Sequence, residues 1–143
     1  MREATQAEER SGLDLVITDE VGQTTTIEVK TEFRAATTGN LVFEVISQAV
    51  PKQPGVIGWG FKLEHTDLIA YIVPGPDEVY VFSCPVLQRW VIDNYGKLRN
   101  FAASNRAYTT LGVLMPISKL SDLVRYQGSL REHVQRYTEP SAL

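Results

Sequence analysis

The segment TIEVKTEFRAATTGNLVFEV, residues 26–45, decides what kind of fold this sequence forms. It opens with Thr, Ile and Val residues, which favour an extended, half-buried backbone. Side chains two residues apart in a strand point to the same face, so Glu28 and Lys30 share one face and Ile27 and Val29 the other. Two interpretations stay open. The strand either carries a solvated ion pair, or it brings a carboxylate and an ammonium together for chemistry.

The segments on either side of this stretch predict a β-rich first half. We expect a short helix over residues 2–10 that ends at Ser11 and Gly12, and a hairpin of strands 13–17 and 24–30 with Gly22 at its turn. A loop over 32–39 then leads to a strand over 40–48, and a second loop follows over 50–60.

The second half predicts two more strands and then helices. The expected elements are a strand over 67–74 buried on both faces, a turn over 74–77, a strand over 78–83, a helix over 85–96, a strand over 108–117, a short helix over 119–124 capped by Ser118, a last helix over 129–137 and a frayed tail over 138–143. This order predicts a mixed α/β layer fold of the α+β type. We expect one domain over residues 1–138, with residues 139–143 as a disordered tail.

Composition excludes several classes of protein. The chain has 143 residues, of which 43% are hydrophobic and 22% charged, as in an ordinary globular domain. No apolar run approaches the length of about 20 residues that a membrane helix needs, and the polar N-terminus does not look like a secretory signal. The single cysteine, Cys84, excludes an internal disulfide and a multi-cysteine zinc site. We therefore expect a cytoplasmic protein with no membrane partner.

Charge is distributed unevenly along the chain, although the net charge is only −3. Residues 1–32 carry eight acidic and three basic side chains, whereas residues 85–137 carry eight basic and three acidic ones. A metal-binding end beside a phosphate-binding surface has this pattern.

Glu28 and Lys30 suit a metal-dependent hydrolase. A divalent cation of the magnesium type prefers oxygen ligands, commonly one or two carboxylates with water and phosphate. Glu28 supplies one carboxylate, and the predicted hairpin brings Asp14 close enough to supply another, with the carbonyl of Val29 as a third ligand. The ammonium of Lys30 can then orient or deprotonate an attacking water, or offset charge on a phosphate.

The wider pattern resembles the PD-(D/E)XK nuclease superfamily, and more closely its small phage-type and restriction-like members. The resemblance rests on GLDLVI, TIEVKTEF, TGNLVFEV, a Gly-rich loop with IGWGF, DLIAYIVP and LGVLMPIS, in that order over residues 7–123. It implies a restriction-endonuclease-like core, with a mixed central β-sheet flanked by helices. Leu13 stands where the family often has proline.

The resemblance also assigns roles to individual residues. Asp14 and Glu28 match the metal-binding carboxylates, and Lys30 matches the catalytic lysine. It implies Mg²⁺ or Mn²⁺ as the cofactor. Some members add an acidic residue from the first helix, here Glu8 or Glu9, and others a polar residue on the third strand, here Glu44 or Gln48.

Other conspicuous side chains keep simpler explanations. Alternation places Glu44 on the exposed face of its strand, and His65 and His133 stand too far apart in sequence to suggest a zinc site. We expect Cys84 to be a small buried apolar residue and Trp90 to belong to a helix core.

The nucleic-acid-binding candidates are one aromatic and several basic residues. Trp59 can stack on a splayed base or wedge into a duplex, and it can equally be a loop residue that anchors on the sheet. The basic candidates for phosphate contacts are Lys52, Lys62, Arg89, Lys97, Arg99 and Arg106, for each of which a solvated surface is the alternative.

These features together predict a Mg²⁺-dependent endonuclease that hydrolyses DNA, with RNA as the less favoured substrate. The resemblance implies a homodimer, because cutting both strands of a duplex or a four-way junction needs two sites, and a host-cytoplasm location if the protein is phage-encoded. Two rival hypotheses remain: an inactive nuclease-fold protein that binds nucleic acid or acts as a scaffold, and an unrelated β-rich interaction domain.

Overall fold

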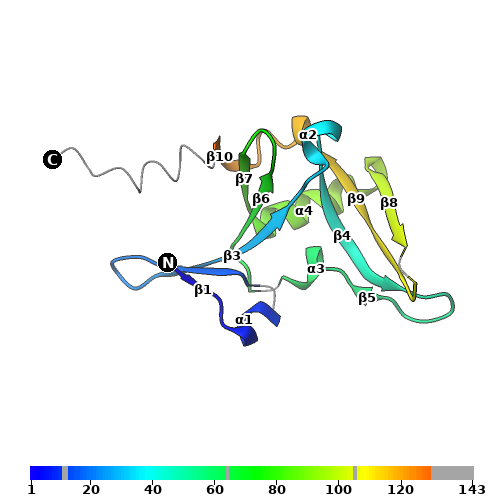
Figure 1. Cartoon of the computed structure of the whole chain (residues 1–143), viewed down its shortest axis with the longest axis horizontal. Helices are drawn as coiled ribbons and strands as arrows, with labels where there is room; N and C mark the ends of the chain where they lie inside the picture. The colour runs from blue at the N-terminus through cyan, green and yellow to red at the C-terminus, as the bar shows by residue number, and fades with distance from the viewer. Residues whose placement is uncertain (11–12, 64, 105, 130–143) are drawn as a thin grey trace.

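The protein is built around two β-sheets (Figure 1). The structure is a computed structural model, which describes residues 1–10, 13–63, 65–104 and 106–129, without the side chains of residues 9 and 10. The six-stranded sheet has the order β1-β2-β3-β6-β7-β10, and the four-stranded sheet the order β5-β4-β9-β8. The expected mixed α+β class is confirmed.

The strands of the six-stranded sheet are β1 (Arg2–Glu3), β2 (Leu15–Thr18), β3 (Thr24–Thr31), β6 (Leu68–Val73), β7 (Glu78–Ser83) and β10 (Val124–Ser129). Those of the four-stranded sheet are β4 (Asn40–Ala49), β5 (Val56–Ile57), β8 (Arg99–Ser104) and β9 (Thr109–Pro116). β3 and β6 pair in parallel, and each of the other described pairs is antiparallel.

The helices are short apart from one. They are α1 (Gln6–Arg10), α2 (Ala35–Thr38), α3 (Trp59–Lys62), the longer α4 (Cys84–Asn94) and the 3₁₀ turns η1 (Tyr95–Lys97) and η2 (Ile117–Lys119). In Figure 1, β3 and β4 converge at α2 and diverge toward α3, with α4 behind them. Within the described part of the chain, no helix is long and apolar enough to cross a membrane.

The core lies between the inner faces of the two sheets and α4. Phe43 of β4 belongs to the same buried cluster as Tyr71 of β6, Phe82 of β7 and Leu87 of α4. Tyr71 also ties the sheets together by a hydrogen bond, because its hydroxyl donates to the carbonyl of Val42 at 3.0 Å. Burial of such large side chains is the main driving force of folding, so the shared cluster determines how the two sheets pack against each other.

The register places the conspicuous charges of β3 on this inner face. Glu28 is opposite Ile69 and Lys30 is opposite Tyr71, and side chains opposite each other in paired strands share a face. Ile69 and Tyr71 are fully buried. The charged face of β3 is therefore the one that continues into the core.

Most predicted strands are confirmed to within two residues, as is the turn at Gly22, whose φ is +84°. The expected helix over 2–10 starts only at Gln6, because Arg2 and Glu3 pair with β2 and extend the sheet. The expected loops over 32–39 and 50–60 contain α2 and, in the second, β5 and the start of α3. Gly39 ends α2 with φ +69°, which glycine adopts without strain.

The predicted burial of β6 on both faces is wrong. Ile69, Tyr71 and Val73 are buried, whereas the alternate residues are only partly buried. β6 pairs in parallel with β3, but only one of its faces packs against the second sheet.

The last third departs most from expectation. β8 is not among the predicted strands, because it is a largely exposed edge strand with little hydrophobic alternation. The predicted helix over 119–124 is also wrong, because Ser118 lies inside η2 and Val124 starts β10, which completes the sheet beside β7. Ser129 belongs to β10, whereas residues 130–143, which hold the rest of the predicted last helix and tail, lie outside the described residues.

Candidate metal centre

The β2–β3 hairpin brings Asp14 beside Glu28, as the sequence predicts. Leu15 pairs with Ile27, so Asp14, immediately before β2, falls at the level of Glu28. The backbone amide of Val29 donates a hydrogen bond of 2.7 Å to Asp14 Oδ2, and the amide of Asp14 donates one of 3.0 Å to the carbonyl of Ile27. Both main chain and side chain therefore fix the Asp14 carboxylate at the end of the hairpin.

Glu28 is a buried carboxylate with an unsatisfied oxygen. The residue is 6% exposed, and within the described part of the chain its Oε2 atom is buried without a hydrogen-bond partner. Burial raises the pKa of Glu28, the ammonium of Lys30 lowers it in part, and the nearby Asp14 carboxylate raises it again. Leaving such an oxygen unpaired costs on the order of 1–3 kcal/mol.

The other oxygen of Glu28 is paired with Lys30. Lys30 Nζ lies 2.5 Å from Glu28 Oε1, and the lysine side chain is 25% exposed. The interpretation of this pair as a solvated surface ion pair is therefore wrong, because the register turns it toward the core.

The backbone at Val29 adds a further oxygen. In an extended strand the N–H and C=O of one residue point to the same edge. Since the amide of Val29 donates to Asp14, its carbonyl also points to the edge of β3 where β2 ends. This orientation fits the predicted third oxygen ligand.

The donor set fits a hard divalent cation. Neighbouring ionised carboxylates repel each other, and a cation that takes Asp14 and Glu28 as ligands would relieve that repulsion. The described residues contain no group of three or more His, Cys, Asp or Glu side chains suited to holding a metal. Mg²⁺, which keeps several waters and takes one or two carboxylates, is the ion that this small set suits.

Lys30 is held by more groups than the sequence analysis anticipated. Its ammonium lies 4.7 Å from the ring centroid of Trp59. Glu32 also acts on it: burial raises the pKa of Glu32, while a bond to the backbone of Val42 and the charge of Lys30 lower it. Glu32 is not among the predicted site residues, although strand alternation places it on the face of Glu28 and Lys30.

The GWG segment explains why Trp59 lies here. A Cβ atom on Gly58 would come within 2.7 Å of Glu44, and one on Gly60 within 2.3 Å of Phe43. Both positions therefore have to be glycine for α3 to rest directly on β4. Glu44, expected to be exposed, is half-buried, and its Oε1 accepts a hydrogen bond of 3.3 Å from the amide of Trp59.

The remaining acidic candidates do not join the site or lie outside the described part. Glu8 accepts hydrogen bonds from Arg2 and Thr5, and the Arg2 guanidinium chiefly lowers the pKa of Glu8 to about 2. The side chain of Glu9 lies outside the described residues. Gln48 is exposed on β4, beyond Glu44 from this centre.

The other singled-out residues behave as simple structure. Cys84 is 2% exposed, and burial raises the pKa of its thiol to about 11, as suits the expected buried apolar residue. Trp90 packs against the core, as expected, while Val86 on the same helix is 47% exposed. His65 is exposed, and His133 lies outside the described residues.

The basic candidates are all exposed, but they do not gather at one place. Lys62 is the last residue of α3, whereas Arg89 pairs with Asp93 on α4. Arg99 is on β8, which β9 separates from β4, and Lys97 and Arg106 flank that edge strand. Lys52 lies in the β4–β5 loop with φ +63°.

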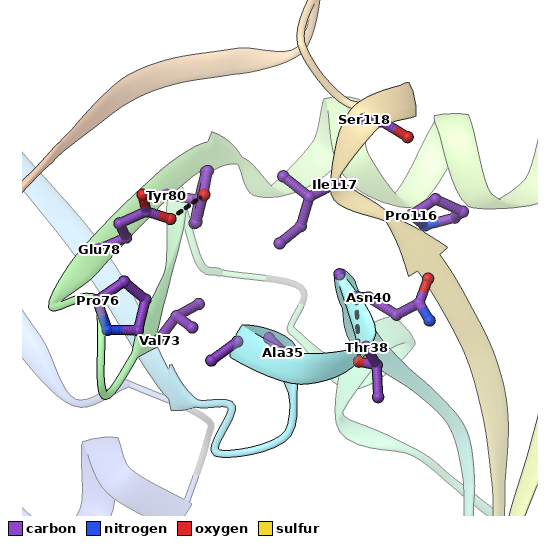
Figure 2. Close-up of a pocket in the computed structure, with 12 residues that line it drawn as sticks. Ala35, Thr38, Asn40, Val73, Pro76, Glu78, Tyr80, Pro116, Ile117 and Ser118 are labelled. Carbon is purple, nitrogen blue, oxygen red and sulfur yellow. Dashed lines mark hydrogen bonds between the residues drawn. The ribbon is translucent and has the colours of Figure 1, made fainter.

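A cavity of about 550 Å³ lies apart from this centre, between α2, η2 and the β6–β7 turn (Figure 2). Its carboxylate, Glu78, accepts a hydrogen bond from the hydroxyl of Tyr80. Burial and Glu78 raise the pKa of Tyr80 to about 12. One oxygen of this carboxylate thus has a partner within the protein.

No protein-family model matches the chain, and no curated protein and no solved structure resembles it. Support for a function therefore comes from the geometry of its own residues.

Proposed function

We propose that this protein is a metal-dependent endonuclease of the PD-(D/E)XK type that hydrolyses DNA phosphodiester bonds. The observation that carries the proposal is the buried Oε2 atom of Glu28, which has no hydrogen-bond partner among the described residues and belongs to a side chain beside Asp14 and two residues from Lys30. A binding domain gains nothing from an unsatisfied buried carboxylate, whereas a hydrolase that loads a divalent cation uses one.

The arrangement of strands supports a restriction-endonuclease-like core as part of this proposal. The two carboxylates come from a hairpin, and the second strand of that hairpin pairs in parallel with a buried strand, β6. The sheet is mixed, and its inner face is covered by the four-stranded sheet as well as by α4.

Asp14, Glu28 and the carbonyl of Val29 would hold the metal. When bound, Mg²⁺ or Mn²⁺ supplies Lewis acidity toward a phosphate oxygen and toward water. A bound cation would also offset the repulsion between the neighbouring Glu28 and Asp14 carboxylates.

Lys30 acts on the scissile phosphate from the open side of the centre. Its side chain is partly exposed, so the ammonium can leave Glu28 Oε1 and donate to an attacking water or to a phosphate oxygen. It thereby orients the nucleophile and offsets the charge that builds up on the phosphate. Lys62, exposed at the end of α3, is the candidate for a contact with a neighbouring phosphate.

The test is a cleavage assay on plasmid, linear duplex, four-way-junction DNA and RNA, with Mg²⁺, Mn²⁺ or EDTA. We expect metal-dependent cutting of DNA that Asp14→Asn and Glu28→Gln abolish and that Glu20→Gln, in the exposed β2–β3 turn, leaves intact. DNA binding without cutting under all conditions would favour the inactive nuclease-fold alternative. A protein that neither binds nor cuts DNA would contradict the proposal.

A homodimer is part of the same proposal, because a single centre cuts one strand at a time. Sedimentation of the protein with and without a four-way junction tests it. We expect two copies on one junction, and a single copy that makes paired cuts would contradict it.

A further inference from the structure

Trp59 is the aromatic side chain that contacts Lys30 in the candidate centre. Its indole is half-buried, and its ring centroid lies 5.5 Å from that of Phe43 and 6.3 Å from that of Tyr71. The ring is therefore packed on the sheet, as one of the two interpretations of the sequence predicts.

The ammonium of Lys30 occupies a face of this ring. Nζ lies 4.7 Å from the ring centroid, within the distance at which the negative face of an aromatic ring attracts a cation. A nucleic-acid base could stack on that face only by displacing the lysine. The geometry thus argues against Trp59 as a base-stacking residue there.

Hydrogen bonds attach the backbone around Trp59 to its neighbours. Gly58 donates a backbone hydrogen bond of 2.8 Å to Val45, and Glu44 accepts one from the amide of Trp59. Gln88 of α4 donates to the carbonyl of Gly60 at 2.8 Å. The short helix α3 is therefore attached to both β4 and α4, and it presents the indole at a fixed place over β3.

We propose that Trp59 is a positioning residue for Lys30: its indole face holds the lysine ammonium at the metal centre and keeps it close by when a cation takes over Glu28. This inference rests on the proposed nuclease function for its catalytic consequence. The contact itself exists in the chain without metal or substrate.

The indole of Trp59 can hold the Lys30 ammonium when Glu28 no longer does. If a cation binds Glu28, the Lys30 ammonium loses the partner that holds it at Oε1, and a free lysine side chain samples many rotamers. The indole face supplies an attraction that does not compete for the carboxylate oxygens. The lysine therefore stays near the scissile phosphate without blocking the metal ligands.

The first measurement uses the metal-free protein. The chain has two tryptophans, so Trp90→Phe leaves Trp59 as the only indole. Because a charge against the ring changes the field on the indole, Lys30→Met should shift the emission of Trp59 in EDTA, whereas Lys62→Met should not. Equal spectra for Lys30→Met and its parent would overturn the inference.

The second measurement separates positioning from DNA binding. We expect Trp59→Leu to lower kcat about tenfold with KM for DNA unchanged, and Trp59→Phe, which keeps an aromatic face, to stay within about threefold of the parent. A higher KM with kcat unchanged would show instead that Trp59 binds the nucleic acid.

The two measurements keep the inference and the function apart. If the parent protein cuts no DNA, the proposed function fails, but the emission of the metal-free protein still decides whether Lys30 sits on Trp59. If the protein cuts DNA and Lys30→Met leaves the emission unchanged, the function stands and the inference fails.

Discussion

Glu28 and Glu78 are two carboxylates on the same six-stranded sheet, and they are treated in opposite ways. Glu78, in the cavity between α2 and η2, accepts a hydrogen bond from Tyr80 (Figure 2). Glu28 has a buried oxygen without a partner in the described part of the chain, a second carboxylate beside it and a lysine on its other oxygen. Glu78 thus has a hydrogen-bond partner within the protein, whereas the buried oxygen of Glu28 has none among the described residues.

The largest effect should separate the two carboxylates in activity. Glu28→Gln is expected to lower metal-dependent DNA cleavage by at least about 100-fold. Mutation of a residue that only hydrogen bonds to a metal ligand typically lowers metal affinity or activity by about 10- to 100-fold, and loss of a ligand itself should cost more. Glu78→Gln should leave the rate within about twofold. Initial rates at saturating Mg²⁺ measure both, and equal losses would show that Glu28 has no special role.

The close packing of α3 on β4 can be tested at Gly60 of α3. A Cβ on Gly60 would meet Phe43 Cε1 at 2.3 Å and the carbonyl oxygen of Glu44 at 2.6 Å. Gly60→Ala should therefore lower the free energy of unfolding by about 1–3 kcal/mol. Gly96→Ala is the matched control, since nothing lies within 4 Å of its Cβ. Urea unfolding of both variants gives the difference, and a stable Gly60→Ala protein would refute the close approach of α3.

Removing the Glu28–Lys30 ion pair and removing the hydrogen bond to Glu78 should change the free energy of unfolding in opposite directions. The pair Glu28→Leu with Lys30→Met removes a largely buried ion pair and should raise the free energy of unfolding in EDTA by about 1–2 kcal/mol. Tyr80→Phe, which takes the hydrogen bond from Glu78, should lower it by about 1 kcal/mol. A destabilised double variant would mean that the ion pair holds the fold and is not a reserve for function.

The smallest effect is a pH dependence. The folded-state pKa of Glu28 is raised above its ordinary value of 4.5, so the folded state binds its proton more tightly than the unfolded state. Its contribution to stability is full below pH 4.5 and is lost as the pH rises through the folded pKa. The metal-free parent should thus lose stability over this range by comparison with Glu28→Gln. Saturating Mg²⁺ should reduce the difference, and parallel profiles in EDTA would contradict the raised pKa.

The candidate centre was predictable because its residues are local. Asp14, Glu28 and Lys30 belong to one hairpin, whose turn at Gly22 and alternating Thr, Ile and Val residues define its register. Glu32 follows from the same alternation. The metal roles assigned to these residues, the DNA substrate and the dimer stay predictions.

The end of the chain was less predictable because its strands lack an amphipathic signal. β8 is an exposed edge, and β10 exists because β7 offers it a free edge to pair with. A strand of this kind is stabilised by a neighbour distant in sequence, which local propensity does not show.

The sequence by itself determined the hairpin, the identity of the charged residues on β3 and the glycines on either side of Trp59. Only the tertiary structure decided which face of β3 is buried. Alternation groups Glu28 with Lys30 but cannot say whether that face meets water or a second sheet, since this depends on how Phe43 and Tyr71 pack across the core. Because of that packing, the carboxylate of the Glu28–Lys30 ion pair is buried, and one of its oxygens has no partner in the part of the chain that the structure describes.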